Sequence, residues 1–481
     1  MPLSESLRLI YENALYDIYL GKSQSENRIT LSVKGLVSGN AKLLFDQPVA
    51  IITGFNPSAN HETVNLVSEA ENQFANQQLE NYLQNRGIEH YPALGYSKDS
   101  THNEPSFALF RVSPEQAAAI GRRFGQAAIF YYNAKPKIAK GEIIDCGEDT
   151  FSLIRRLPLV ELHIHTEGSI PVSHLLQMLH KSNSEKSEYI QTEDDLSKYL
   201  SFKNFHEFIK KWIWMISLIQ TEADYSSIVY SVIESLHSIG VVHSELHFSP
   251  FDHLERLHPS AITESAIDGL KRAQLDFGVS SVLIADLVRN HPVETARSRI
   301  DLISHLVGDH LVGLGLGGSE SKFAAELFSD SFEYARSKGF RTVAHAGETA
   351  GAESVRSALF NLKAERIGHG IRALEDAALV EQLVKLQTPL EVCITSNQST
   401  GVIDDIENHP VRKMIDSGLN VCLSSDDPTM FRTNVQLEFD LLVSDFSAKK
   451  TEIKQLAKNS ILASFASTER KSELLTNHDL I

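Results

Sequence analysis

The sequence predicts an α/β protein in which a (β/α)8 TIM-type barrel follows a smaller α/β domain. The chain has 481 residues, too many for one ordinary compact core, so two domains are expected. After residue 156, eight short apolar stretches alternate with helical sequence, and from the second onward they begin 23 to 38 residues apart. That spacing fits one strand plus one helix. An open doubly wound sheet is the main structural competitor, but the sequence lacks its Gly-rich phosphate loop.

Residues 1–150 have their own pattern of strands and helices. The strand-like run PVAIITGFNP (48–57) precedes a long polar helix that ends near Arg86 and Gly87. The strand SFALFRV (106–112), the helix SPEQAAAIGRRFG (113–125) and the strand AAIFYYNA (127–134) follow. This second helix begins with a serine cap and a proline in its first turn. We therefore predict a small α/β domain over 1–150 and a barrel domain over 151–481.

The barrel domain contains one predicted strand for each of the eight units that the fold requires. Polar residues follow nearly every strand, and in a barrel the C-terminal ends of the strands form one rim where active sites lie. Residues far apart in the sequence are therefore expected to converge. In chain order, the predicted strands are LVELHIH (159–165), VVHSELHF (241–248), VSSVLIADLV (279–288), LVGLGLG (311–317), RTVAHAG (341–347), RIGHG (366–370), PLEVCITSN (389–397) and NVCLSSDDP (420–428).

The composition excludes several classes of protein. The net charge of −17 argues against binding to nucleic acid, which needs clustered Lys and Arg. No apolar run reaches the roughly 18 residues of a membrane helix, and the N-terminus lacks a secretory pattern. The three cysteines, Cys146, Cys393 and Cys422, suggest neither a disulfide framework nor a thiolate metal site. We expect a cytoplasmic protein that acts on a small molecule.

Histidines and acids at four strand ends suggest a metal site. His163 and His165 stand two apart on a strand, so both imidazoles face the barrel interior. His345 supplies a third imidazole, and Asp426 and Asp427 supply adjacent carboxylates that face different directions. Three neutral imidazoles and one carboxylate suit Zn²⁺, with a position left for water. Such an ion lowers the pKa of bound water toward neutrality.

Each feature alone also has a simpler explanation. An isolated H-x-H pair is more often two hydrogen-bonded core histidines. Asp426 and Asp427 could form a solvated turn before Pro428. Glu348 could be a surface acid, and His369 between two glycines could belong to a tight turn. The metal site is favoured because four such features lie at four separate strand ends.

Two further patterns have structural interpretations, and the second also has a functional one. His243, Glu245 and His247 face one way, but the two histidines are about 13 Å apart and cannot share one ion. We interpret them as polar residues of the barrel interior, with Glu245 a candidate to support a metal ligand. Three phenylalanines at helical spacing in the insert after the first strand form either a core stripe or a lid over a flat substrate. They are Phe202, Phe205 and Phe208.

Taken together, VELHIHTEGSIP, LGLGGSE, HAGE, RIGHG, CITSNQSTG and LSSDDPTMF resemble the adenosine deaminase family of metal-dependent hydrolases, in family order, from about Leu157 onward. The resemblance implies one Zn²⁺ per subunit. It also implies hydrolysis of adenosine or deoxyadenosine to inosine or deoxyinosine and ammonia, by attack of a zinc-bound hydroxide at purine C6. Cytidine-type zinc deaminases carry P-C-x-x-C, and this chain has no C-x-x-C.

The resemblance assigns a role to each candidate residue. Glu348 would move a proton at purine N1, and His369 would orient and help activate the hydroxide. The zinc ligands would be His163, His165, His345 and Asp426. The substrate would meet His165, Glu167, the Gly318 backbone at N3, and Asp427 at N7.

Glu167 leaves the substrate open. Adenosine deaminases usually carry Asp at this position, whereas relatives that act on adenine or aminodeoxyfutalosine often carry Glu, which leaves less room for a sugar. TSNQSTG resembles the adenosine branch instead, and adenosine or deoxyadenosine is the first expectation. A non-catalytic nucleoside sensor is a hypothesis from a different class. Hydrolysis of another bond, with a second metal and a carboxylated lysine, is a third hypothesis.

The N-terminal region separately resembles a small bacterial domain of unknown function. The resemblance is carried by ITGFNP, NQQLENYLQNRG, NEPSFALF and GRRFGQAAIFYY. It implies no activity. Oligomerisation, ligand sensing and stabilisation of the barrel are three roles that the sequence leaves open for this domain.

Overall fold

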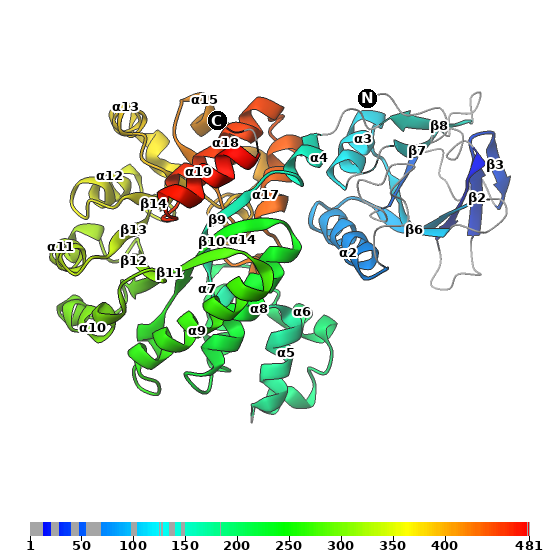
Figure 1. The fold of residues 1–481 in the computed structure, drawn as a ribbon. Helices are drawn as coiled ribbons and strands as arrows, with labels where there is room; N and C mark the ends of the chain where they lie inside the picture. The colour runs from blue at the N-terminus through cyan, green and yellow to red at the C-terminus, as the bar shows by residue number, and fades with distance from the viewer. Residues whose placement is uncertain are drawn as a thin grey trace. The chain divides into compact units, whose positions relative to one another are not determined.

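The structure is a computed structural model that describes residues 13–20, 28–39, 48–53, 69–97, 103–124, 126, 128–133, 140–145, 150–182, 184–478 and 480. The chain divides into two compact units, Met1–Leu153 and Ile154–Ile481. Figure 1 shows both units, and each is described by itself. None of the helices in the described ranges is both long enough and apolar enough to cross a membrane.

The N-terminal unit is built on one eight-stranded antiparallel sheet with the strand order β3-β2-β1-β5-β6-β4-β7-β8. Within the described residues, helices α2 (Glu69–Asn85) and α3 (Pro114–Arg123) accompany it. The strands are β1 (Leu15–Tyr19), β2 (Arg28–Ser32), β3 (Gly35–Ser38), β4 (Val49–Ile52), β5 (His90–Tyr96), β6 (Asn103–Phe110), β7 (Ala128–Asn133) and β8 (Lys140–Asp145). The predicted strands and helices are therefore present, and the end of the first predicted strand, 54–57, lies outside the described residues.

Apolar side chains cover both faces of this sheet because buried residues alternate along its strands. Along β4, Ala50 and Ile52 join the cluster beneath α2 and α3, whereas Val49 and Ile51 join the cluster on the opposite face. The predicted serine cap of α3 is also present, since the Ser113 hydroxyl accepts a hydrogen bond from the Gln116 N–H at 3.2 Å. The unit thus has a core of its own.

The second unit is a barrel of eight parallel strands that follow one another in chain order from β9 to β16. Paired backbone hydrogen bonds close it, because the His165 N–H donates to the Asp426 carbonyl at 2.8 Å and the Asp426 N–H to the His163 carbonyl at 2.9 Å. The strands are β9 (Leu159–His165), β10 (Val241–Phe248), β11 (Ser280–Val288), β12 (Leu311–Gly317), β13 (Arg341–Ala346), β14 (Arg366–His369), β15 (Leu390–Val392) and β16 (Val421–Leu423). The predicted barrel is confirmed.

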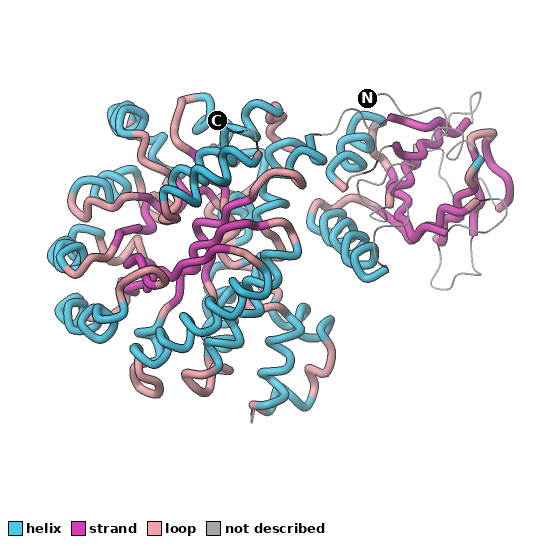
Figure 2. Tube along the Cα trace, in the orientation of Figure 1, coloured by secondary structure: helices cyan, strands magenta, loops and turns pink. Residues whose placement is uncertain are grey.

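Helices surround the strands of this unit, as the cyan and magenta segments of Figure 2 show. The helices are α5 (Val172–Lys181), α6 (Glu193–Leu200), α7 (Phe205–Ile216), α8 (Asp224–Ser238), α9 (Pro259–Phe277), α10 (Ala296–Ile303), α11 (Ser329–Ser337), α12 (Ala352–Phe360), α13 (Ala377–Leu386), α14 (Ile394–Ser399), α15 (Val411–Asp416), α16 (Pro428–Phe431), α17 (Val435–Ser444), α18 (Lys450–Ala463) and α19 (Thr468–Asn477). Helix α4 (Thr150–Ile154) spans the boundary between the two units. Two short 3₁₀ helices matter for the site, η2 (Glu167–Ser169) and η4 (Pro250–His253).

Strand β12 presents glycines at alternate positions toward neighbouring side chains of the barrel. A Cβ atom on Gly313 would lie 3.1 Å from the Ile284 side chain, and one on Gly315 would lie 1.8 Å from Asp286 Oδ1. The sequence LVGLGLG thus forms a strand that leaves room for residues of β10, β11 and β13. Glycine is required at Gly315 because of close approach.

The predicted strand over 389–397 is only partly correct. Strand β15 ends at Val392, and Ile394 begins α14. The buried Glu438 carboxylate accepts hydrogen bonds from the backbone N–H groups of Ile394 and Thr395, at 2.9 and 3.1 Å. These are N–H groups that a new helix leaves without a partner in its first turn. A side chain 44 residues away thus turns the segment from strand to helix.

Candidate active site

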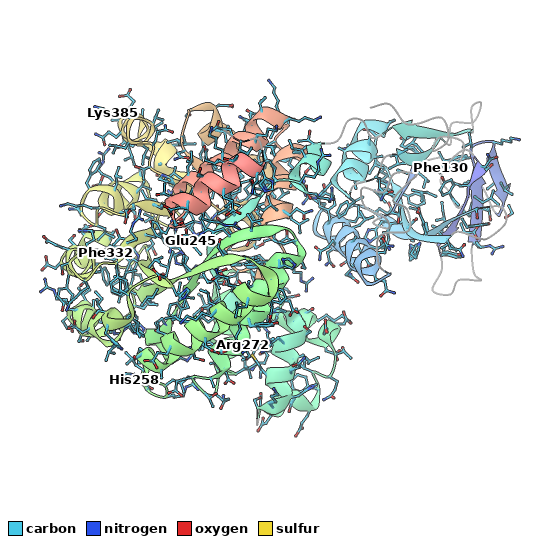
Figure 3. All side chains as sticks on the ribbon, viewed as in Figure 1. Phe130, Glu245, His258, Arg272, Phe332 and Lys385 are labelled. Atoms are coloured by element: carbon cyan, nitrogen blue, oxygen red, sulfur yellow. The ribbon has the colours of Figure 1, made fainter. Side chains whose placement is uncertain are left out.

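The predicted metal-site residues lie at the C-terminal rim of the barrel. His163 and His165 end β9, His345 lies near the end of β13, and Asp426 follows β16. Below them the barrel interior is polar. In Figure 3, Glu245 lies among the barrel strands, and Lys385 marks the outer helix α13. The barrel thus brings together side chains that are up to 263 residues apart in the sequence, from His163 to Asp426.

Three imidazole nitrogens and one carboxylate oxygen lie close together, and a ligand atom of His369 is also within 4.8 Å of those of His163, His345 and Asp426. The His345 Nε2 atom lies 3.0 Å from His163 Nε2 and 3.2 Å from His165 Nε2. The Asp426 Oδ1 atom lies 3.7 Å from His163 Nε2 and 3.3 Å from His165 Nε2. All four residues are buried or nearly so. These separations are those expected of ligands around one small cation with bonds of about 2.0–2.2 Å.

The partner of each Nδ1 atom fixes where the proton of each imidazole lies. His163 Nδ1 lies 2.8 Å from the Glu391 carboxylate, His345 Nδ1 lies 3.1 Å from the Leu316 carbonyl, and His165 Nδ1 lies 3.5 Å from the Asp286 carboxylate. Because these oxygens only accept, each Nδ1 carries the proton, and each Nε2 of a neutral ring has a lone pair. Lone pairs about 3 Å apart repel one another unless a positive charge lies between them.

The electrostatics of the cluster favour a cation in the same place. Burial lowers the pKa of His163 and of His345 well below the usual value, which keeps both rings neutral. Although burial opposes both shifts, hydrogen bonding with His165 holds the pKa of Asp426 well below its usual range, and Asp286 and Asp426 raise the pKa of His165. Without an ion, a proton on His165 therefore supplies the positive charge at this place, and a metal ion would replace that proton. Three imidazoles and one ionised carboxylate are a donor set that zinc prefers. The residues present therefore fit the metal.

A buried chain of charges supports His163 from below. Glu391 accepts the hydrogen bond from His163 and a second one from Arg366, at 2.5 Å. Arg366 also lies 2.6 Å from Glu245, which in turn lies 3.3 Å from His243. The prediction that Glu245 belongs to the polar interior is in agreement with these contacts. Glu391 and Arg366 were not predicted, although each is a charged residue in an otherwise apolar strand.

Asp286 and Ser396 support two other members of the cluster. The Asp286 carboxylate lies 3.0 Å from His247 Nδ1 as well as beside His165. The Ser396 hydroxyl donates to Asp426 Oδ2 at 2.6 Å, which leaves Oδ1 directed to the histidines. Neither residue was predicted from the sequence. Asp286 could have been found, because it interrupts the apolar run of β11 on the same face as Ile284.

Glu348 lies at the edge of the cluster, where Glu320 holds its loop. Glu348 Oε2 is 3.8 Å from His369 Nε2. The Glu320 carboxylate accepts hydrogen bonds from the backbone N–H groups of Gly347, Glu348, Thr349 and Ala350. Burial raises the pKa of the Glu348 carboxyl, and the charges of Asp426 and Glu320 add to this shift. Glu348 is therefore biased toward the protonated acid.

His369 and Asp426 both have left-handed backbones, with φ of 61° and 65°. Such angles are costly for residues other than glycine and are typical of functional sites. His369 Nε2 lies 3.9 Å from Asp426 Oδ2 and faces the cluster, while its Nδ1 lies 3.2 Å from the Asn397 side-chain amide. His369, predicted to lie beside the metal site, is therefore next to Asp426.

The predicted substrate contacts line the rim next to the metal cluster. Burial, followed by the charge of Asp426, raises the pKa of Asp427 well above its usual value. A Cβ atom on Gly168 would lie 1.6 Å from Asp427 Oδ1, so Asp427 needs a glycine beneath it. Gly318 has φ of 88°, and a Cβ atom there would lie 2.7 Å from Asn290 Oδ1. Both glycines are required by close approach.

Glu167 is fully buried and held on one side only. Its Oε1 atom accepts hydrogen bonds from the Tyr225 hydroxyl at 2.7 Å and from the Ser249 N–H at 2.9 Å. Its Oε2 atom is buried and has no hydrogen-bond partner within the described part of the chain, and the same holds for Asp427 Oδ1. Burial raises the pKa of Glu167. Two buried carboxyl oxygens at the rim thus have no hydrogen-bond partner among the described residues.

Aromatic residues of the insert pack beside Asp427. The Phe208 ring stacks on Phe431 at 5.2 Å, and the Phe202 ring lies 5.4 Å from Phe208. Trp212 of α7 hydrogen-bonds with the Asp427 side chain. The side chain of Phe205, the third predicted member, lies outside the described residues. The insert thus contacts the rim, as a lid requires.

A barrel whose rim holds three imidazoles and a carboxylate close together, with a buried acid of raised pKa beside them, defines a metal-dependent hydrolase. The adenosine deaminase family model matches residues 158–479, and the chain belongs to this family of hydrolytic deaminases. A second model, a protein of unknown function (DUF3293), matches residues 52–129. Both predicted resemblances are confirmed.

Individual relatives carry three different names. The chain is 30% identical to an aminodeoxyfutalosine deaminase of Streptomyces coelicolor, over 80% of this chain and 97% of that protein. It is 32% identical to an adenosine deaminase of Clostridium acetobutylicum, over 68% of this chain and 98% of the relative. The crystal structure of an adenine deaminase from Arthrobacter aurescens matches with a TM-score of 0.63 and 32% identity, covering 67% of this chain and 98% of that one.

Proposed function

We propose that this protein is a zinc-dependent deaminase that converts adenosine or deoxyadenosine to inosine or deoxyinosine and ammonia. The observation that carries the proposal is the convergence of three Nε2 atoms and Asp426 Oδ1 beside Glu348. Bound by these four residues, one Zn²⁺ would lower the pKa of a water and so supply a hydroxide nucleophile at neutral pH. A sensor that only binds nucleosides would need neither the ion nor the acid.

The residues of the rim divide the remaining work. Protonated Glu348 donates to purine N1, which makes C6 more electrophilic. Protonated Asp427 donates to N7, and the Gly318 backbone meets N3. The Oε2 atom of Glu167 accepts a hydrogen bond from the part of the substrate farthest from C6. The aromatic residues of the insert exclude water from the flat ring.

The test is turnover by the full-length, zinc-loaded protein, followed by the ultraviolet shift from adenosine to inosine. Glu348→Gln should abolish turnover and leave the zinc content unchanged, because the amide cannot exchange a proton with N1. Inactivity of the zinc-loaded protein on every aminopurine would overturn the proposal. Zinc-free protein with full activity would overturn the role of the metal.

Free adenine is a second candidate, favoured by the fixed position of Glu167. This side chain is one methylene longer than Asp, fully buried and held by Tyr225 and Ser249, so it cannot swing away to admit a sugar. A panel of adenosine, deoxyadenosine, adenine, AMP and aminodeoxyfutalosine separates the candidates. Glu167→Asp should raise kcat/KM for nucleosides relative to adenine if the longer acid excludes the sugar.

We further propose that residues 1–150 and 151–481 are separate domains and that the chain works in the reducing cytoplasm. Cys393 and Cys422 are buried free thiols, which supports the second proposal. Calorimetry of the full chain should show two unfolding transitions, of which only one moves to lower temperature when zinc is removed by a chelator. A single transition would contradict the division.

A further inference from the structure

A chain of buried hydrogen bonds leads away from His369 on the side opposite the metal cluster. The side-chain amide nitrogen of Asn397 lies 3.2 Å from His369 Nδ1. The Oδ1 atom of Asn397 lies 3.1 Å from His409 Nε2. His409 Nδ1 lies 3.1 Å from the backbone nitrogen of Val411, the first residue of α15. All three side chains are buried.

The backbone N–H of Val411, at the end of this chain farthest from His369, fixes the direction of the hydrogen bonds. A backbone N–H can only donate, so His409 Nδ1 accepts from Val411 and carries no proton. Burial lowers the pKa of His409 to about 3, which keeps this ring neutral. A neutral imidazole with a bare Nδ1 has its proton on Nε2. His409 therefore donates to Asn397.

Asn397 transmits this direction to His369. Its carbonyl oxygen must face the N–H of His409, because the opposite orientation would place amide hydrogens against that N–H. Its amide group then donates to His369 Nδ1, so a neutral His369 has its proton on Nε2. That Nε2 atom faces the cluster, 3.8 Å from Glu348 Oε2 and 3.9 Å from Asp426 Oδ2.

This arrangement is the reverse of the one found at the three metal ligands. His163, His165 and His345 each have an acceptor at Nδ1, so the neutral form of each ring has its lone pair at Nε2. His369 has a donor at Nδ1 and therefore an N–H at Nε2. A nitrogen that carries hydrogen cannot bind a metal. The same residue type at the same rim is thus given a different role by the partner of one atom.

We propose that Asn397 and His409 are positioning residues that fix His369 in its Nε2–H tautomer, so that His369 donates a hydrogen bond to the oxygen that attacks purine C6. The proposal rests on the proposed function. In this tautomer His369 orients the attacking oxygen and stabilises negative charge on it. His369 therefore acts as a donor and not as the base that removes a proton.

The first test is Asn397→Asp in the full-length, zinc-loaded protein. The new carboxylate has the shape of the amide but only accepts, so it should draw the proton of His369 to Nδ1. We expect kcat to fall about 10- to 100-fold, as for other residues that orient catalytic groups, with little change in KM or zinc content. Unchanged kcat would overturn the proposal.

His409 offers a matched pair of variants. His409→Asn keeps an acceptor for the Val411 N–H but has no donor that reaches Asn397, so kcat should fall. His409→Gln places an amide N–H near the position of the imidazole Nε2 and should restore much of kcat. A purely structural role would instead predict similar losses of kcat and of melting temperature in both variants, and that result would overturn the proposal.

A measurement without turnover separates this proposal from the proposed function. In protein labelled with ¹⁵N-histidine, His369, assigned by its loss in His369→Gln, should show a pyridine-type Nδ1 and a pyrrole-type Nε2. In Asn397→Asp the two signals should exchange or become those of a protonated ring. A pyrrole-type Nδ1 in the unaltered protein would overturn the proposal, whether or not the protein deaminates any purine and even if Asn397→Asp does not fold.

Discussion

The barrel interior distinguishes chemically identical side chains by their neighbours. Acceptors lie behind the Nδ1 atoms of His163, His165 and His345, whereas a donor lies behind that of His369. In a buried site such hydrogen bonds are stronger than in water, so the partner of Nδ1 decides which tautomer is stable. The acids are distinguished likewise, since Asp426 is held ionised while burial favours the protonated forms of Glu348 and Asp427.

Glu391 provides the sharpest test of support for a ligand. Glu391→Gln replaces the acceptor charge behind His163 with an amide and leaves Arg366 with one carboxylate fewer. We expect zinc affinity to fall about 10- to 100-fold. The measurement is competition with a calibrated chelator.

Glu381→Gln is the matched control for Glu391→Gln, because Glu381 is exposed on α13. This variant should bind zinc like the unaltered protein. Equal zinc affinities in both variants would show that Glu391 does not support the ligand.

Strand β12 shows how glycines within a strand help to build the site. Gly315→Ala would place a methyl group 1.8 Å from Asp286 Oδ1 and 3.2 Å from His247 Nδ1. Asp286 would have to move, and overpacking of this kind costs about 1–3 kcal/mol. We expect a lower melting temperature and weaker zinc binding, because His165 loses its oriented partner.

The control for Gly315→Ala is Gly308→Ala, since a Cβ atom at Gly308 meets nothing within 4 Å. Gly308→Ala should leave zinc affinity and the melting temperature nearly unchanged. Similar zinc affinities for the two alanine variants would contradict the role of β12.

Helix α7 carries both tryptophans of the chain, Trp212 and Trp214. Trp212 hydrogen-bonds with Asp427, the proposed N7 donor, so a purine bound to Asp427 should alter the surroundings of Trp212. Binding of inosine should therefore change the intrinsic fluorescence in Trp214→Phe, which keeps Trp212. The change should be lost in Trp212→Phe. A signal that survives only in Trp212→Phe would show that α7 does not respond through Asp427.

The pH dependence of stability is a property of the whole molecule to which His253 contributes. Burial, followed by the charge of Arg256, lowers the pKa of His253 to about 4, below the ordinary value of 6.5. Between these values the unfolded chain binds one more proton at this site, so the free energy of unfolding falls as the pH falls. His253→Gln should reduce that slope by about 1.4 kcal/mol per pH unit.

The measurement is denaturant unfolding of the full chain at several pH values between about 4 and 6.5. His237→Gln is the control, because His237 is exposed on α8. This variant should show the same slope as the unaltered protein. A slope unaffected by His253→Gln would mean that His253 is already protonated in the folded protein.

Much of this molecule follows from local patterns. Apolar runs separated by helical sequence define eight barrel strands, and the period of two puts His163 and His165 on one face. Polar residues after those strands must meet at one rim because parallel strands of a closed barrel end on the same side. Charged residues inside apolar strands, such as Asp286 and Glu391, also indicate which side chains orient the predicted metal ligands.

The tautomers of the rim histidines and the end of β15 depend on contacts between residues far apart in the sequence, which no local pattern contains. The acceptor behind His163 lies 228 residues away, and the donors that begin α14 meet a carboxylate 44 residues away. Such partners are chosen by strand register and by closure of β9 on the segment after β16. A side chain's chemistry is set by its residue type, but the position of its proton is set by the atom opposite, and only the closed barrel decides which atom that is.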